Sequence, residues 1–131
     1  MLRGEVYEVD FGPGVGREPS GPHPAVIVSN DTLNVAPFAL IVVPGILTTS
    51  AATHRWIGVE VTAAESGLAA DTTFLCYRIS SVDPSRVKPG PLATLPAARM
   101  ADIDHILLSL LGLNTPPSPP PPPGRRTAPR P

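Results

Sequence analysis

The chain has 131 residues and a formal net charge of −1, and 42% of its residues are hydrophobic against 16% that are charged. This balance predicts one soluble globular domain and argues against a broad nucleic-acid-binding surface, which needs excess positive charge. The charge is uneven, however: all eleven acidic residues lie in 1–113 with seven basic ones, whereas 114–131 holds three arginines. Any nucleic-acid site in the body must therefore be local.

The last 18 residues differ in composition from the rest of the chain. Residues 114–131 hold nine prolines, five of them consecutive at Pro119–Pro123, and no large apolar side chain. Such a segment cannot bury enough surface to offset the entropy lost on ordering. We therefore predict a folded domain over residues 1–113 and a disordered Pro-rich tail over residues 114–131. A polyproline II docking peptide and an electrostatic RNA tether are the alternatives for the tail.

Cysteine usage and hydropathy indicate a cytoplasmic protein. Cys76 is the single cysteine, so no internal disulfide can form, which fits a reducing compartment. The N-terminus lacks a secretory pattern, and the longest apolar run, 35–47, is interrupted by prolines and too short to span a bilayer. The three histidines and one cysteine show no metal-ligand spacing, so neither a metal nor a cofactor is expected.

Short apolar segments at roughly ten-residue spacing, separated by turn residues, predict a small barrel or sandwich. Tyr7, Val9 and Phe11 share one side at period two, which predicts a half-buried strand over 5–11. A Gly/Pro-rich loop follows, and Asn30 with Asp31 is suited to start a helical turn. The other predicted strands are 25–29, 38–43 ended by Pro44-Gly45, 56–61, 73–79 and a short edge strand within 87–95.

One amphipathic helix is predicted near the end of the body. Pro96 lies near its first turn and Gly112 near its C-cap. Five apolar residues recur at the spacing of one helix face: Ile103, Ile106, Leu107, Leu110 and Leu111. The predicted fold class is therefore α+β, mostly β, a small β-barrel with a C-terminal amphipathic helix.

Several short motifs follow one another in a characteristic order. They are Arg3–Tyr7, Gly16–Glu18, His23–Asp31, Val42–Ser50, Tyr77–Asp83 and Leu111–Leu113. Together they resemble the MazF/PemK (Kid-like) toxin family of type II toxin–antitoxin systems, over residues 3–113. The resemblance implies an SH3-like β-barrel, a homodimer, and an endoribonuclease toxin that cuts single-stranded RNA or mRNA without a metal. It also implies a cognate antitoxin whose extended segment lies across the RNA groove.

The implied reaction needs an acceptor for the 2′-hydroxyl proton, a stabiliser for charge on phosphorus and a donor to the leaving oxygen. By the resemblance, His23 and Thr48 are the candidate catalytic residues. His23 stands where the family has a catalytic arginine; an imidazole can transfer protons but cannot form a permanent bidentate phosphate clamp. Thr48 follows Leu47 as the family's threonine follows an apolar residue, and Thr49 is the alternative.

Four residues are the candidate RNA-binding set: Glu18, Thr49, Arg78 and Tyr77. Arg78 stands where the family usually has glutamine, and Ser80 stands at the family's arginine; we predict both on the same face of one strand. Tyr77 replaces a frequent aspartate and is able to stack on a base. The alternatives are a solvated Glu18, a surface arginine and a packing tyrosine.

The departures from the family pattern leave a second function open. A catalytically degenerate member would act as an RNA- or antitoxin-binding module. A peptide-binding SH3-like module is a third hypothesis, and it requires an exposed aromatic groove.

Overall fold

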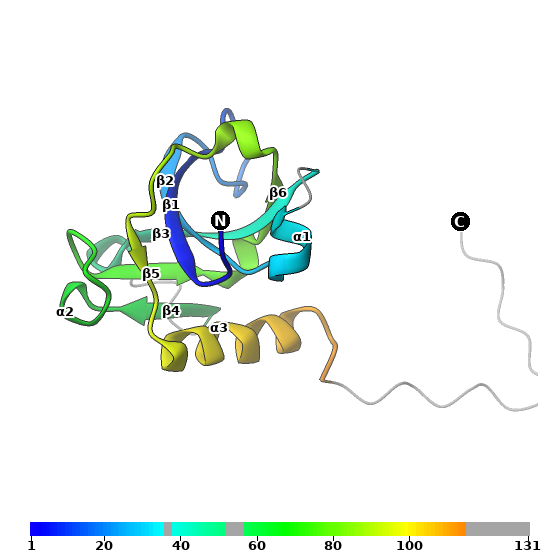
Figure 1. Cartoon of the computed structure of the whole chain (residues 1–131). Helices are drawn as coiled ribbons and strands as arrows, with labels where there is room; N and C mark the ends of the chain where they lie inside the picture. Colours follow the sequence, from blue (N-terminus) through cyan, green and yellow to red (C-terminus); the bar gives the residue numbers. More distant parts are fainter. Residues whose placement is uncertain (36–37, 52–56, 115–131) are drawn as a thin grey trace, which may run out of the picture.

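The computed structural model describes residues 1–35, 38–51 and 57–114. Seven strands in these ranges form one sheet in the order β4-β5-β3-β2-β1-β7, with β6 paired to β3. The sheet curls into a half-barrel, and α3 runs beneath β4 and β5 (Figure 1). The strands are β1 (Glu5–Asp10), β2 (Pro22–Ile27), β3 (Leu40–Leu47), β4 (Gly58–Val61), β5 (Thr72–Leu75), β6 (Ser80–Val82) and β7 (Ala93–Thr94). The helices are α1 (Asp31–Val35), α2 (Ala63–Ser66) and α3 (Ala97–Leu110).

The predicted α+β, mostly β class with a C-terminal helix is confirmed. The predicted tail lies outside the described residues apart from Asn114, as do 52–56 with Trp56. Within the described ranges, no helix has the length and apolar character needed to cross a membrane.

Both faces of the sheet are buried, because adjacent strand residues contribute to different clusters. Val6 and Val26 belong to the cluster that α3 covers, together with Phe74 and Ile103. Tyr7 and Val9 belong to a second cluster, inside the curl, with Ala25, Ile27, Leu40, Val42, Val82 and Val87. The period-two prediction for 5–11 is therefore correct: Tyr7 and Val9 share one face, and Val6, on the opposite face, packs toward α3.

β3 is the strand about which the sheet turns. Its residues 40–42 pair with β6, 42–44 with β2 and 45–47 with β5. Gly45 stands at the turn, where a Cβ would lie 2.6 Å from Cγ2 of Thr72. The prediction that Pro44-Gly45 ends the strand is wrong. β3 continues through these residues and changes its pairing partner there from β2 to β5. Because Gly45 has no side chain, β5 can approach β3 closely.

The predicted single strand over 73–79 is also corrected. β5 ends at Leu75, a 3₁₀ turn occupies Cys76–Arg78, and β6 begins at Ser80. Both strands pair with β3, and the turn between them allows the sheet to bend. Arg78 and Ser80 therefore do not share one strand face.

Cys76 is fully buried, and burial raises the pKa of its thiol to about 11, so the thiol is protonated at neutral pH.

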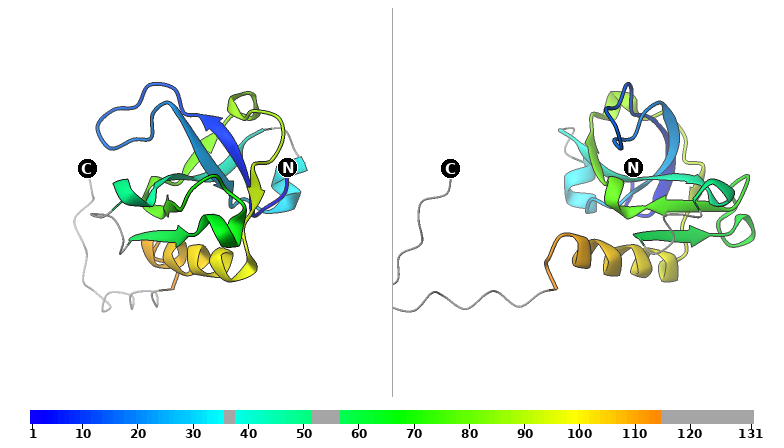
Figure 2. Two further views of the ribbon diagram at one scale, coloured as in Figure 1. Left: turned by 90° about the vertical axis from the view of Figure 1, so that its left-hand side faces the viewer. Right: turned by 180° about the vertical axis from the view of Figure 1, so that it is seen from behind.

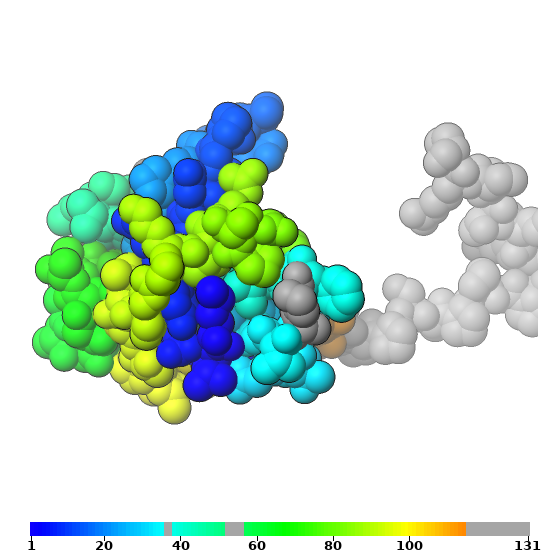
Figure 3. Space-filling model, turned by 45° about the horizontal axis from the view of Figure 1, so that its top comes forward, coloured from blue at the N-terminus to red at the C-terminus, as the bar shows by residue number. Residues whose placement is uncertain are grey.

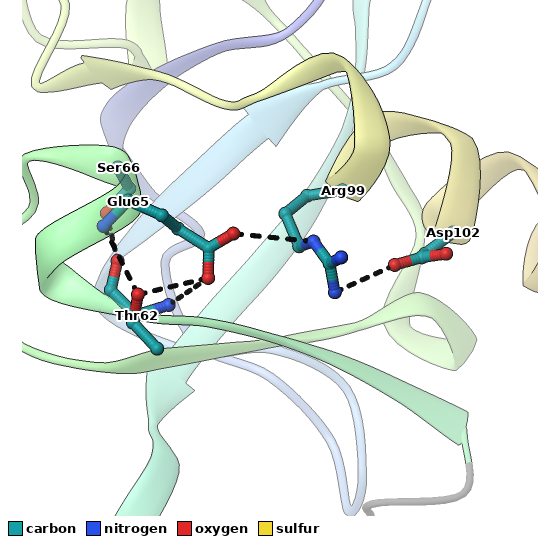
Figure 4. A network of polar contacts seen from close by, with 5 residues as sticks. All are labelled: Thr62, Glu65, Ser66, Arg99 and Asp102. Carbon is teal, nitrogen blue, oxygen red and sulfur yellow. Dashed lines mark hydrogen bonds and ion pairs between the residues drawn. The ribbon is translucent and has the colours of Figure 1, made fainter.

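α2 was not predicted, and it links β4 to α3 through polar contacts (Figure 4). Thr62 caps it: its side chain accepts from the Glu65 backbone N–H at 3.2 Å, and its own N–H donates to Oε2 of Glu65 at 2.9 Å. That hydrogen bond from the Thr62 backbone is the main cause of a lowered pKa at the Glu65 carboxyl. Arg99 of α3 pairs with Glu65 at 3.4 Å and with Asp102 at 2.9 Å.

The predicted apolar face of α3 is confirmed at its centre and wrong at its end. Ile103 and Leu107 are buried, and Ile106 packs against the same cluster. Leu110 and Leu111 are 42% and 57% exposed, because the helix ends at Leu110 and its last turn extends past the cluster. The apolar surface there continues onto Leu108 and Leu113.

Candidate nucleic-acid interface

The loop between β1 and β2 forms one wall of the candidate site. Its ends are joined by backbone hydrogen bonds from Phe11 to Gly21 at 3.0 Å and from Gly21 to Gly12 at 2.8 Å. Gly12 has a φ of +68°, and a Cβ there would lie 2.8 Å from Nη1 of Arg86, so the turn requires glycine. The loop projects at the end of the molecule opposite α3 (Figure 2).

Two adjoining pockets lie between this loop and the chain from Tyr77 to Arg86. The larger, of about 430 Å³, is lined by Val15, Arg17, Glu18, Pro19, Tyr77, Arg78, Ile79 and Ser80. The smaller, of about 220 Å³, is lined by Phe11, Pro13, Glu18, Pro19, Ser80, Ser81, Val82 and Arg86. The pockets share Glu18, Pro19 and Ser80, so they form one groove, which we call the loop groove. Figure 3 shows the blue loop standing against the yellow-green chain that follows β6.

The loop groove is positive although the body is acidic. Its described lining contains three guanidinium groups, from Arg17, Arg78 and Arg86, and one carboxylate, from Glu18. Arginine forks match phosphate geometry, and clustered arginines concentrate positive potential within a concave surface. The charge of this groove is consistent with the expectation that any nucleic-acid site on the acidic body is local.

Arg78 is held against the groove wall with spare hydrogen-bonding capacity. Its Cζ lies 5.4 Å from the ring centroid of Tyr77, a cation–π distance. Its Nε is buried and has no hydrogen-bond partner among the described residues. A buried donor without an acceptor is costly, and this nitrogen is closed to solvent in the structure.

His23 lies on β2 beside the groove and does not appear among the residues that line it. Its Nε2 is 2.9 Å from the Ser20 carbonyl oxygen, which can only accept, so the proton is on Nε2 and Nδ1 carries the lone pair of the neutral ring. The ring centroid is 6.3 Å from that of Phe11, which lines the smaller pocket. The imidazole is therefore half-buried, oriented, and able to accept a proton at Nδ1.

Thr48 follows β3 directly, at the end of the β2–β3 pair where β2 begins. It is half-buried, its N–H donates to the Asp71 carbonyl at 3.0 Å, and its Oγ1 lies 3.0 Å from Oγ1 of Thr73. Thr49 is exposed in the same 3₁₀ turn. Thr48 is thus the more firmly positioned of the two hydroxyls.

The structure brings some of the predicted residues together and keeps others apart. Glu18, Tyr77 and Arg78 line one pocket. His23 does not line it but lies next to Phe11, and Thr48 lies in the turn that follows β3. Sequence reasoning missed Arg17 and Arg86 as groove residues. Arg86 carried one local signal: Asp83 caps the turn that presents it, and Pro84 occupies that turn's first position.

Across residues 1–35, 38–51 and 57–114, no group of three or more His, Cys, Asp or Glu side chains is arranged to hold a metal ion.

Solved structures identify the class of protein to which this architecture belongs. MazF from Deinococcus radiodurans superimposes with a TM-score of 0.73 at 26% identity, over 86% of this chain and 96% of that one. An endoribonuclease in complex with its cognate antitoxin, from a Mycobacterial species, gives a TM-score of 0.63 at 25% identity, over 88% and 97%. The fold is that of the small toxins of toxin–antitoxin systems.

The sequence comparisons narrow this class to one family. Residues 2–111 match the model of the PemK-like, MazF-like toxins of type II toxin–antitoxin systems, and the chain belongs to that family. Endoribonuclease MazF from Staphylococcus epidermidis is 34% identical over 117 residues, covering 87% of this chain and 93% of the relative. Endoribonuclease MazF9 from Mycobacterium tuberculosis is 33% identical over 112 residues, covering 82% and 92%. The predicted family and its class of activity are confirmed.

Proposed function

We propose that this toxin cuts single-stranded RNA, with the loop groove binding the chain and His23 and Thr48 carrying the chemistry without a metal. The observation that carries the proposal is the group of three arginines around one carboxylate on an otherwise acidic body. A toxin with this charge distribution attracts polyanions at one place and repels them elsewhere.

Each residue has a role that its surroundings permit. Nδ1 of His23 accepts the 2′-hydroxyl proton, and the Thr48 hydroxyl donates to a phosphoryl oxygen as negative charge develops there. The attacking 2′-oxygen forms a bond to phosphorus while the bond to the 5′-oxygen breaks, and a water molecule protonates the departing 5′-oxygen, which gives a 2′,3′-cyclic phosphate and a 5′-hydroxyl. Arg78 contacts a neighbouring phosphate, and Tyr77 stacks on a base. Glu18 orients a sugar hydroxyl in the groove.

The spacing of these residues requires an extended substrate. Ser80 in the groove wall pairs with Val42 of β3, and Thr48 comes six residues after Val42. Six residues of straight strand span at most about 20 Å at about 3.3 Å per residue, and the turn at Gly45 shortens this distance. A single nucleotide does not cover that distance, so the proposed substrate is an oligonucleotide or longer RNA.

The test is incubation of the purified protein with single-stranded RNA in the presence of EDTA, followed by analysis of the product ends. The proposal expects cleavage with 5′-hydroxyl ends and 2′,3′-cyclic or 3′-phosphate ends. Intact RNA throughout pH 5 to 8 would refute it.

The alternative of a degenerate, binding-only member is favoured by one observation, the histidine at the arginine position. Under our proposal, His23→Arg lowers kcat about 100-fold, because a guanidinium can contact phosphate but cannot accept the proton. The measurement is single-turnover cleavage of a labelled RNA by both proteins. A rise in cleavage on this substitution would identify the native site as degenerate.

The partners form part of the same proposal. Solved MazE-MazF complexes from Deinococcus radiodurans, at 26% identity, support a cognate antitoxin. We propose that its extended segment lies across the loop groove. The exposed leucines at the end of α3, Leu108, Leu110, Leu111 and Leu113, are apolar surface that a second copy would cover, which supports a homodimer.

A further inference from the structure

The Thr48 hydroxyl has a buried neighbour that sequence reasoning did not identify. Oγ1 of Thr73 lies 3.0 Å from Oγ1 of Thr48. Thr73 sits inside β5, where its backbone pairs with Ile46 of β3 and Glu60 of β4, and it is 2% exposed. Its hydroxyl therefore has no access to bulk water, whereas Thr48 is half-buried and does.

This difference in exposure sets the direction of the hydrogen bond. Each hydroxyl has one O–H to donate and lone pairs to accept. A buried donor left without an acceptor is costly, whereas a donor at the surface can use water or a ligand. The pair is therefore most stable when Thr73 donates and Thr48 accepts. The proton of Thr48 then points away from Thr73, toward the exposed side.

The main chain leaves little other freedom at Thr48. Its N–H donates to the Asp71 carbonyl at 3.0 Å, and its carbonyl accepts from the Ala51 N–H at 3.1 Å. With the backbone fixed at both ends of the turn, the hydroxyl position depends on χ1, which has few wells in a β-branched residue. The contact with Thr73 selects one of them.

We propose that Thr73 is a positioning residue for RNA cleavage, which directs the Thr48 hydroxyl proton at the phosphoryl oxygen. The inference rests on the proposed function and deepens it. When a phosphoryl oxygen accepts from Thr48, the donors form a chain from Thr73 to Thr48 to phosphate, and each bond polarises the next. Thr73 touches no reacting atom and acts only through Thr48.

The test is Thr73→Val, which removes the hydroxyl at nearly constant volume, measured against Thr72→Val. Thr72 is a neighbouring buried threonine whose hydroxyl donates to the Ala70 carbonyl at 3.1 Å and does not contact Thr48. We expect Thr73→Val to lower kcat about tenfold with KM unchanged, the usual size of one lost hydrogen bond. Thr72→Val should stay within about twofold of wild type, since its hydroxyl only satisfies a local carbonyl.

A double-mutant cycle separates positioning from a general loss of structure. In a Thr48→Val background the Thr73→Val change should have no further effect on the residual kcat, because the group it orients is gone. An equal loss in both backgrounds, or a Thr73→Val enzyme no slower than Thr72→Val, overturns the inference.

Two further readouts keep the result unambiguous. If Thr73→Val does not fold, Thr73→Ser and Thr73→Ala, which differ only in Oγ, give the same comparison: serine should retain kcat and alanine should lose it. Failure of the wild-type protein to cleave RNA overturns the proposed function and this inference together, whereas an active wild type with an unaffected Thr73→Val enzyme overturns this inference alone.

Discussion

Thr48→Val is expected to lower kcat for RNA cleavage about 100-fold, the loss typical of removing one donor to developing negative charge. The change keeps the β-branched shape, so the turn after β3 retains its packing. KM should change little, because the groove arginines that bind the RNA backbone are untouched. Single-turnover rates at saturating enzyme give the chemical step directly.

Thr49→Val is the variant that distinguishes the two candidate threonines. Thr49 is the next residue in the same turn, and its side chain is exposed, so its loss should alter kcat by less than about twofold. The Thr48 variant also leaves the Thr73 hydroxyl without its partner, so its melting temperature must be recorded beside the rate. If Thr49→Val shows the large loss and Thr48→Val does not, the two assignments are reversed.

Ile103→Ala is expected to lower the free energy of unfolding by about 3 kcal/mol, within the usual range for removing a large buried aliphatic side chain. Ile103 is fully buried where α3 covers Val6, Val26 and Phe74, so the change leaves a cavity at the centre of the first cluster. Such a loss is a large part of the roughly 5–15 kcal/mol that stabilises a domain.

Urea unfolding followed by circular dichroism measures this effect, at one fixed protein concentration because self-association would shift the midpoint. Val35→Ala in α1 is the control, since Val35 is also an aliphatic helix residue but is 82% exposed, and its change should stay within about 0.5 kcal/mol. Equal losses in the two variants would mean that α3 does not depend on Ile103 for its attachment.

The sequence was most informative where local patterns decide the structure. Period-two alternation predicted β1 with Tyr7 and Val9 on one face, and the spacing of Ile103 and Leu107 predicted α3. The Asn30 cap is likewise local: its Oδ1 accepts from the Leu33 N–H at 2.8 Å. α2 also has a local sequence signal, because Thr62 and Glu65 form a capping box three residues apart.

The errors lie where long-range contacts override local signals. Pro44-Gly45 has the composition of a turn, yet β3 continues through it because β5 pairs with 45–47 and leaves no room for a side chain. The apolar run at 73–79 bends at Cys76–Arg78 because one strand, β3, holds its two halves. The Thr48–Thr73 contact joins residues 25 apart and has no sequence signature. The sequence does not show that Arg86 lines the groove, because this depends on how the β1–β2 loop packs against the chain after β6.

The change of partner within β3 bears on how such a toxin would choose its cleavage site. In the proposed arrangement, the end of β3 that pairs with β6 holds the wall that recognises RNA, and the other end leads into Thr48. β3 is paired along its whole length, first with β6 and β2 and then with β5, so it fixes the distance between a recognised base and the bond that is cut. Selectivity would then depend on the length of the backbone between two sites as well as on base contacts.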